Sequence, residues 1–357
     1  MRNTAFAHID LSAIRHNLGI VRRLCPQSRI MAMVKADAYG HGLLQVAEVL
    51  READGLGVAR LDEGLALRSA GFTQRILLLA TLLDADDLAL CSAQNIDVTA
   101  HDAYSVAAVA AASRQHPLRV WLKLDSGMHR LGLDPSAFMA ADRQLSQLPG
   151  VTDLTHMTHF SDSEVLDSDK TSRQLRCFTE CHIQNGHAKV SLANSAALIA
   201  RPDTRADWVR PGIMLYGCNP LGTNEVALRP AMTVVSYIIA IRELAVGEPV
   251  GYNERWVTER PSRIATVGIG YGDGYPRHTP NGTPVSLGGA VVPLVGRVSM
   301  DTIAVDVTDR PLAKVGDRVV LWGPEVPVAT VAARAGTISY ALLAGLGQRV
   351  TRKFEGA

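Results

Sequence analysis

The chain of 357 residues has almost no net charge, because 36 Lys and Arg face 35 Asp and Glu. This balance gives no electrostatic basis for binding nucleic acid or an anionic membrane. No apolar run reaches the ~18–20 residues that a membrane span needs, and the N-terminus lacks the apolar core of a signal peptide. The five cysteines include no C-x-x-C pair, which indicates reduced thiols. These absences predict a cytoplasmic protein without nucleic-acid or membrane partners.

Lysine is also scarce, at six of the 36 basic residues, so a lysine in an apolar segment is informative. Lys35 and Lys123 each follow an apolar run. Burial lowers the pKa of a lysine and makes its amine a nucleophile toward aldehydes. Alternatively, the stem of each lysine packs while its ammonium reaches water. We interpret Lys35 as a candidate Schiff-base lysine, for which pyridoxal phosphate is the obvious aldehyde.

Strand-like apolar runs alternate with stretches of helical spacing over the first 220 residues. Such alternation indicates βαβ units with a parallel sheet. An open doubly wound sheet would usually offer a glycine-rich phosphate turn after its first strand, and none is present there. The pattern therefore favours a (β/α)8 barrel of the TIM type over residues 11–222. The eight expected strands are 29–38, 55–60, 75–80, 97–101, 119–125, 153–160, 189–195 and 209–217.

Beyond Gly222 the helical spacing gives way to apolar runs separated by Gly and Pro turns. We expect residues 223–357 to form a mainly β C-terminal domain, and we assign residues 1–10 to it. The glycine-rich stretch 268–275 fails the G-x-G-x-x-G pattern, because Asp273 stands where the third glycine belongs. We interpret that stretch as a structural loop.

Polar residues gather at the ends of the expected barrel strands, where a barrel places its active site. Asn194-Ser195 and Arg210-Pro211-Gly212 provide a hydroxyl and backbone N–H groups for a phosphate, although Ser195 alone would be an ordinary strand-end cap. For His156 and His159 we expect no acidic or cysteine partner close by, so we predict no metal site. The strand-end residues are Lys35, Arg60, His101, Lys123, Asp125, His159, Ser195 and Arg210.

The segment Val34-Lys35-Ala36-Asp37-Ala38-Tyr39-Gly40-His41-Gly42 resembles the signature of the pyridoxal-phosphate alanine racemases. The resemblance extends in order from about residue 4 to the C-terminus. A length of 357 residues is similar to that of the shorter bacterial members linked to alanine catabolism. Further matching blocks are 123–132, 159–161, 194–195, 210–217, 251–253, 270–274 and 296–301.

The resemblance implies that Lys35 carries the cofactor and is one of two acid/base groups. Tyr252 matches the other, contributed from the second subunit of a homodimer with shared active sites. Racemisation needs a base on one face of Cα and an acid on the opposite face. His159 resembles the residue beside that tyrosine, and Arg210 the arginine that keeps the pyridine nitrogen unprotonated. The product D-alanine is a peptidoglycan precursor.

Other positions match residues that bind the cofactor or the amino acid. Arg130 resembles an arginine that reaches the substrate carboxylate, with Met300 and Asp301 beside it. Lys123 matches a position that is often carbamylated, where the carbamate would hold Arg130. The phosphate-binding set is Tyr39, Ser195, Gly212, Ile213 and Tyr340. The residues that match the entrance of the site are Tyr271, Arg277, Arg297, Asp301 and Ile338. Either Asp162 or Glu164 lines the same entrance, and we do not assign which.

Three alternatives stay open. A racemase of broader specificity, for serine or other amino acids, would share this architecture. A decarboxylase would place a carboxylate at the pyridine nitrogen, against which Arg210 argues. A catalytically silent cofactor-binding protein would need no opposed pair such as Lys35 and Tyr252.

Overall fold

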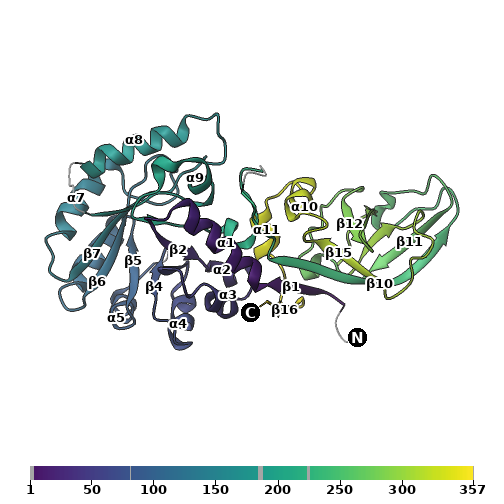
Figure 1. Cartoon of the computed structure of the whole chain (residues 1–357), viewed down its shortest axis with the longest axis horizontal. Coiled ribbons are helices and arrows are strands. Elements are labelled where there is room, and N and C mark those ends of the chain that lie inside the picture. Colours follow the sequence, from purple (N-terminus) through teal and green to yellow (C-terminus); the bar gives the residue numbers. More distant parts are fainter. Residues whose placement is uncertain (1–3, 81, 184–187, 223–225, 357) are drawn as a thin grey trace. The chain divides into compact units, whose positions relative to one another are not determined.

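The computed structural model describes residues 4–80, 82–183, 188–222 and 226–356 (Figure 1). The chain divides into two compact units. The β unit comprises Met1–Ala13, Tyr39–Gly42 and Arg229–Ala357, and the barrel unit comprises Ile14–Ala38 and Leu43–Leu228. In the described ranges, no helix combines the length and apolar character that crossing a membrane requires.

Eight parallel strands close the barrel unit, in sequence order, with β2 pairing β9 to complete the ring. The predicted (β/α)8 barrel is confirmed. The strands are β2 (Arg29–Met33), β3 (Gly55–Val58), β4 (Arg75–Leu78), β5 (Ile96–Ala100), β6 (Leu118–Lys123), β7 (Val151–Met157), β8 (Lys189–Ser191) and β9 (Trp208–Val209). The last strand is much shorter than the expected 209–217, because Pro211 lacks an N–H donor and a 3-10 turn follows it.

Helices connect these strands, and several begin at an aspartate whose side chain accepts backbone N–H groups. Asp84, Asp102 and Asp134 cap helices in this way. The helical elements are α1 (Leu11–Leu24), α2 (Lys35–Gly40), α3 (Leu43–Val49), α4 (Leu61–Ser69), α5 (Ala85–Ala93), α6 (Ala103–Ala112), α7 (Pro135–Leu145), α8 (Lys170–Ile183), α9 (Ser195–Ala200), η1 (Pro202–Thr204) and η2 (Ile213–Tyr216).

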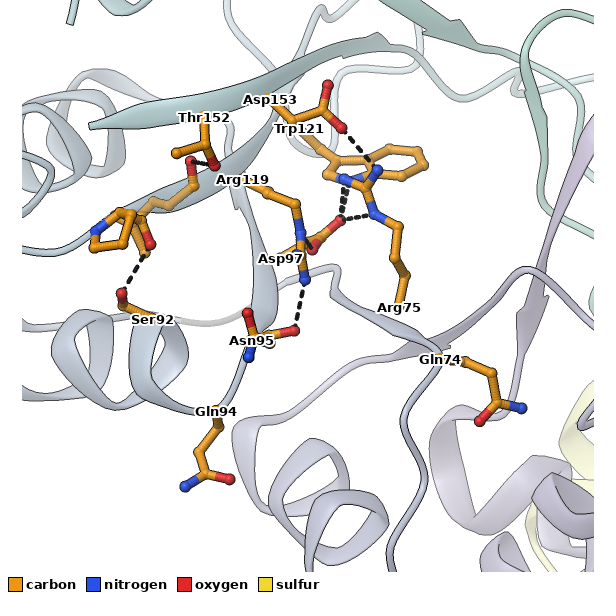
Figure 2. A network of polar contacts seen from close by, with 12 residues as sticks. Gln74, Arg75, Ser92, Gln94, Asn95, Asp97, Arg119, Trp121, Thr152 and Asp153 are labelled. Atoms are coloured by element: carbon orange, nitrogen blue, oxygen red, sulfur yellow. Dashed lines mark hydrogen bonds and ion pairs between the residues drawn. The ribbon is translucent and has the colours of Figure 1, made fainter. Parts of the chain in front are cut away.

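Charged residues at the N-terminal ends of the strands form a network that we call the N-terminal pole: Arg75, Asp97, Arg119, Asp153 and Lys189. Figure 2 shows the first four of these residues. The fully buried Asp97 carboxylate accepts hydrogen bonds from Arg75 Nε at 2.7 Å and Arg119 Nε at 2.5 Å. Asp153 lies 2.7 Å from Arg75 Nη1 and 3.0 Å from Lys189 Nζ. Every cation of this pole therefore has a carboxylate partner.

The β unit contains a mainly antiparallel sheet, which confirms the predicted β-rich C-terminal part. Its strand order is β11-β14-β13-β12-β15-β10-β1-β16, with a further pairing of β11 to β10. Residues 6–10 form β1, which lies between antiparallel β10 and parallel β16. The Gly270–Gly274 stretch forms a tight turn in which Asp273 accepts the Gly270 N–H at 2.9 Å.

In chain order, the β unit contains β1 (Phe6–Asp10), β10 (Met232–Leu244), η3 (Tyr252–Glu254), β11 (Ser262–Val267), η4 (Tyr271–Asp273), β12 (Pro284–Leu287), β13 (Ala290–Val295), β14 (Ile303–Asp306), β15 (Arg318–Trp322), α10 (Val328–Arg334), α11 (Ser339–Ala344) and β16 (Thr351–Glu355).

Candidate active site

Five basic residues follow the C-terminal ends of barrel strands, and we call them the C-terminal pole: Lys35, Lys123, Arg130, His159 and Arg210. Lys123 ends β6, Arg210 directly follows β9, and the other three lie in the segments after β2, β6 and β7. Parallel strands bring these ends to one rim of a barrel. Arg60 and His101, also expected at strand ends, follow β3 and β5.

The turn that begins at Lys35 is left-handed. Ala36, Asp37, Ala38 and Tyr39 have φ angles of 53–55°, a conformation that costs about 1–2 kcal/mol for each L-residue. Two side chains hold the turn: Glu63 accepts the Ala36 N–H at 2.6 Å, and Asp37 accepts the Leu43 N–H at 2.7 Å. The expectation of a strand over 29–38 is therefore wrong after Met33. A strained turn at a polar strand end is typical of functional sites.

Burial lowers the pKa values of Lys35, Lys123, His159 and Arg210, and repulsion between basic residues adds to this effect for the first three. The pKa of Lys35 is lowered by burial and then by Arg130 and Arg210, against an opposing effect of Glu63. For Lys123, burial, Arg210 and Arg130 lower the pKa to about 8. Burial lowers the pKa of Arg210 to about 10 and holds the pKa of His159 well below its ordinary value. These groups favour an anionic ligand.

The two carboxylates near this pole bind backbone amides. Asp125 Oδ1 accepts the N–H groups of residues 127, 128 and 129, each at 3.0 Å. Glu63 accepts the N–H groups of residues 36, 59 and 60. Among the residues that the structure describes, no carboxylate forms an ion pair with Lys35, Lys123 or Arg210. The pole therefore retains an excess of positive charge.

Neutral groups hold the buried Arg210 guanidinium. It donates to Ser191 Oγ at 2.5 Å, the Thr158 carbonyl at 2.6 Å and the Leu192 carbonyl at 3.2 Å. Ser195, at the start of α9, accepts the Gly212 N–H at 2.9 Å. The hydroxyl, Gly212 and Ile213 thus lie together after the last two strands, as a phosphate site in a barrel requires.

The remaining predicted residues belong to the β unit. The rings of Tyr39 and Tyr340 lie 6.1 Å apart, and burial raises the pKa of Tyr39. Tyr252, in η3, is 65% exposed, and Met300 is also exposed. Asp301 is bound by Arg349 at 2.6 Å. The Tyr39–Tyr340 and Asp301–Arg349 contacts both lie within the β unit.

Three features differ from what the sequence indicated. The expectation that His156 has no acidic residue nearby is wrong, because its Nε2 lies 2.7 Å from Asp142 Oδ1 and its Nδ1 lies 3.0 Å from His182 Nδ1. Sequence reasoning also missed Glu63, whose place three residues after Arg60 is typical of a helix N-terminus. It missed Gln174 as well, for which local sequence gives no signal.

Comparison with known proteins identifies the family. The model of the alanine racemase N-terminal domain matches residues 9–220, and that of the C-terminal domain matches residues 231–354. The chain belongs to the alanine racemase family. A catabolic alanine racemase of Pseudomonas aeruginosa is 47% identical, with 99% of each chain covered.

Solved structures of family members agree over the whole chain. The biosynthetic alanine racemase of Pseudomonas aeruginosa matches with a TM-score of 0.96 at 45% identity, covering 99% of both chains. The alanine racemase of Bartonella henselae, with covalently bound pyridoxal phosphate, matches with a TM-score of 0.92 at 31% identity over 99% of both chains. The chain is thus about equally similar to a catabolic and a biosynthetic family member.

Proposed function

We propose that this chain interconverts L-alanine and D-alanine by a pyridoxal-phosphate-dependent, two-base mechanism. The observation that carries the proposal is the C-terminal pole, which combines a lysine of lowered pKa with further cations that lack carboxylate partners in the described chain. Membership of the alanine racemase family supports the reaction. Residues 11–222 would hold the cofactor, and residues 223–357 with 1–10 would complete the site of a second copy.

The residues present fit pyridoxal phosphate. Lys35 offers an amine whose lowered pKa favours its neutral form. Ser195, Gly212 and Ile213 offer a hydroxyl and backbone amides for the phosphate, and Tyr39 and Tyr340 are assigned to the same set. Arg210 offers a guanidinium that nothing in the described chain neutralises. When bound, pyridoxal phosphate supplies a Schiff-base linkage to amines and an electron sink that acidifies Cα–H.

Arg210 keeps the ring nitrogen unprotonated in this proposal, because a buried guanidinium donates hydrogen bonds without giving up its proton. With Arg210 in this role, pyridoxal phosphate would supply a weaker electron sink, which would suppress side reactions such as transamination. A decarboxylase would favour a carboxylate at this position.

Two bases act on opposite faces of the substrate Cα. Lys35 moves the proton on one face, and Tyr252 from a second copy moves it on the other. The exposure of Tyr252 leaves its hydroxyl available to another subunit. His159 and Arg210 would help that tyrosine to give up its proton when it acts as a base. The homodimer is thus part of the proposed active site.

Arg130 would bind the substrate carboxylate, to which Met300 would supply a backbone N–H, and Asp301 would be a further substrate-binding residue. Lys123 is proposed to react with carbon dioxide, since a pKa of about 8 gives a substantial neutral fraction near neutral pH. The carbamate would convert a repulsive neighbour of Arg130 into an anion that holds it.

The test is a panel of L- and D-amino acids, serine included, incubated with the holoenzyme in D2O and separated by chirality. Racemisation of alanine with deuterium at Cα is expected, whereas its absence would reject the proposal. Tyr252→Phe should lower both directions by about 10²- to 10⁴-fold and keep the visible absorption of bound pyridoxal phosphate. Lys35→Ala should lose that absorption. Wild-type exchange in Tyr252→Phe would reject the tyrosine's role.

A further inference from the structure

Gln174 on α8 joins two loops of the C-terminal pole. Its Oε1 accepts the Ser161 N–H at 2.9 Å and the Ser161 hydroxyl at 3.1 Å. Its Nε2 donates to the His159 carbonyl at 3.1 Å and to Ser126 Oγ at 3.3 Å. The side chain is buried, and these bonds use both donors and both acceptor positions of the amide.

These partners fix the orientation of the amide. A flipped amide would set its oxygen against the His159 carbonyl and its NH2 against the Ser161 N–H, and both contacts would be repulsive. Since Gln174 tolerates a single arrangement, it specifies the relative position of the segments on either side of it.

A directional chain of hydrogen bonds continues from Gln174 into the barrel. Ser126 and Thr158 hydroxyl oxygens lie 2.7 Å apart, and Thr158 donates to the Leu124 carbonyl at 3.0 Å. Ser126 therefore donates to Thr158 and accepts from Gln174. The Thr158 carbonyl in turn accepts from Arg210 at 2.6 Å.

We propose that Gln174 is a positioning residue for racemisation. It acts by holding loop 124–134, which carries Arg130, against segment 158–161, which carries His159. This inference rests on the proposed function for its catalytic consequence, while its mechanical part stands on the hydrogen bonds alone. Gln174 would not touch the substrate; it sets the separation of two groups that would.

Gln174→Met keeps the length of the side chain and removes all four hydrogen bonds. Amide hydrogen exchange of the full-length chain, with and without pyridoxal phosphate, should accelerate about tenfold or more in segments 125–134 and 158–163. In the holoenzyme, kcat/KM for alanine should fall about 10- to 100-fold, because small displacements of catalytic groups are costly. The pH profile of kcat/KM should shift as His159 moves.

Two variants separate positioning from general destabilisation. Gln174→Glu keeps the Ser161 bonds but replaces the donor to Ser126 and the donor to the His159 carbonyl with an oxygen. Exchange should therefore accelerate in both segments, and in 158–163 by less than in Gln174→Met, because the Ser161 bonds remain. Thr171→Val is the matched control, because Thr171 lies buried one turn earlier on α8 and its hydroxyl has no hydrogen-bond partner in the described chain. The control should leave exchange, kcat/KM and the pH profile unchanged.

The proposal is overturned if Gln174→Met lowers the melting temperature without changing exchange or the pH profile, or if Thr171→Val produces the same changes. Should Gln174→Met fail to fold, Ser126→Ala removes the same link from the other side and should accelerate exchange in 125–134. A wild-type chain that does not racemise alanine would reject the proposed function, and the exchange measurements would still decide whether Gln174 holds the two loops.

Discussion

The two ends of the barrel differ in how their charged residues are paired. At the N-terminal pole, Arg75, Arg119 and Lys189 are matched by Asp97 and Asp153, and Figure 2 shows the two arginines directed at these carboxylates. At the C-terminal pole, the pKa values of Lys123 and Arg210 are lowered, and the nearby carboxylates of Glu63 and Asp125 accept hydrogen bonds from backbone amides. In barrels, the first end serves stability and the second serves function. The paired charges at the first end and the excess of positive charge at the second agree with that division.

The difference between the two poles also indicates how a bound ligand would contribute to stability. Paired charges need nothing further, whereas buried charges without partners destabilise the fold until an anion arrives. A phosphate and a carboxylate are anions of the required kind. Substitutions that neutralise a charge should therefore lower the free energy of unfolding at the N-terminal pole and raise it at the C-terminal pole.

The largest effect is expected for Asp97→Asn. It leaves Arg75 and Arg119 without a shared, fully buried carboxylate, and breaking such a group typically costs about 3–5 kcal/mol. Chemical denaturation of the full-length chain measures the loss. Asp169→Asn, which removes the exposed Arg173 pair on α8, is the control and should cost less than about 1 kcal/mol. Equal losses in both variants would remove the N-terminal half of the comparison.

Lys123→Met should change stability in the opposite direction. A pKa lowered from 10.5 to about 8 means that the ammonium destabilises the fold by about 3 kcal/mol at pH 7, so the variant should be more stable by about that amount. In the unfolded chain Lys123 binds a proton up to a higher pH. Wild-type stability should therefore rise between about pH 8 and 10.5, and the advantage of the variant should disappear there.

Unfolding of the cofactor-free chain in buffer without carbon dioxide, at pH 7 and pH 10, measures both effects. A variant less stable than wild type at pH 7 would contradict the repulsion assigned to this pole. If the variant is still more stable than wild type by the same amount at pH 10, its higher stability comes from packing and not from the removal of a charge. The same variant should lose racemase activity, since Lys123 would no longer form a carbamate.

The sequence predicted the barrel and the location of Lys35, Lys123 and Arg210 because strand–helix alternation determines where strand ends lie. It did not predict the left-handed turn after Lys35, since Ala36 and Ala38 have no local preference for positive φ. The ion pairs could not be predicted either, because nothing in the local sequence distinguishes Arg75 and Arg119 from Arg210. Only the closure of the barrel brings Asp97 and Asp153 to the first two, and Gln174 to the loops it joins.

Phosphate should stabilise the cofactor-free chain through the C-terminal pole. A ligand at a hundred times its Kd adds about 2.7 kcal/mol, and thermal unfolding in inorganic phosphate, at constant ionic strength, measures the gain. Ser195→Ala should lose most of it, because the Ser195 O–H, whose oxygen accepts the Gly212 N–H, is the donor that would bind phosphate. Asp97→Asn should keep it in full. A gain that Ser195→Ala retains and Asp97→Asn loses would place the anion at the wrong pole.

The smallest effect is expected for Lys189→Met at the N-terminal pole. Lys189 is 40% exposed, and Asp153 stays paired with Arg75 at 2.7 Å after the lysine is removed. An ion pair of this exposure contributes less than about 1 kcal/mol, so chemical denaturation should show a small loss at low salt that shrinks as salt is added. The change distinguishes a network from a set of pairs. If Lys189→Met instead costs as much as Asp97→Asn, the Lys189–Asp153 contact is coupled to the cluster of Arg75, Asp97 and Arg119, and its treatment as an exposed pair of small energy is wrong.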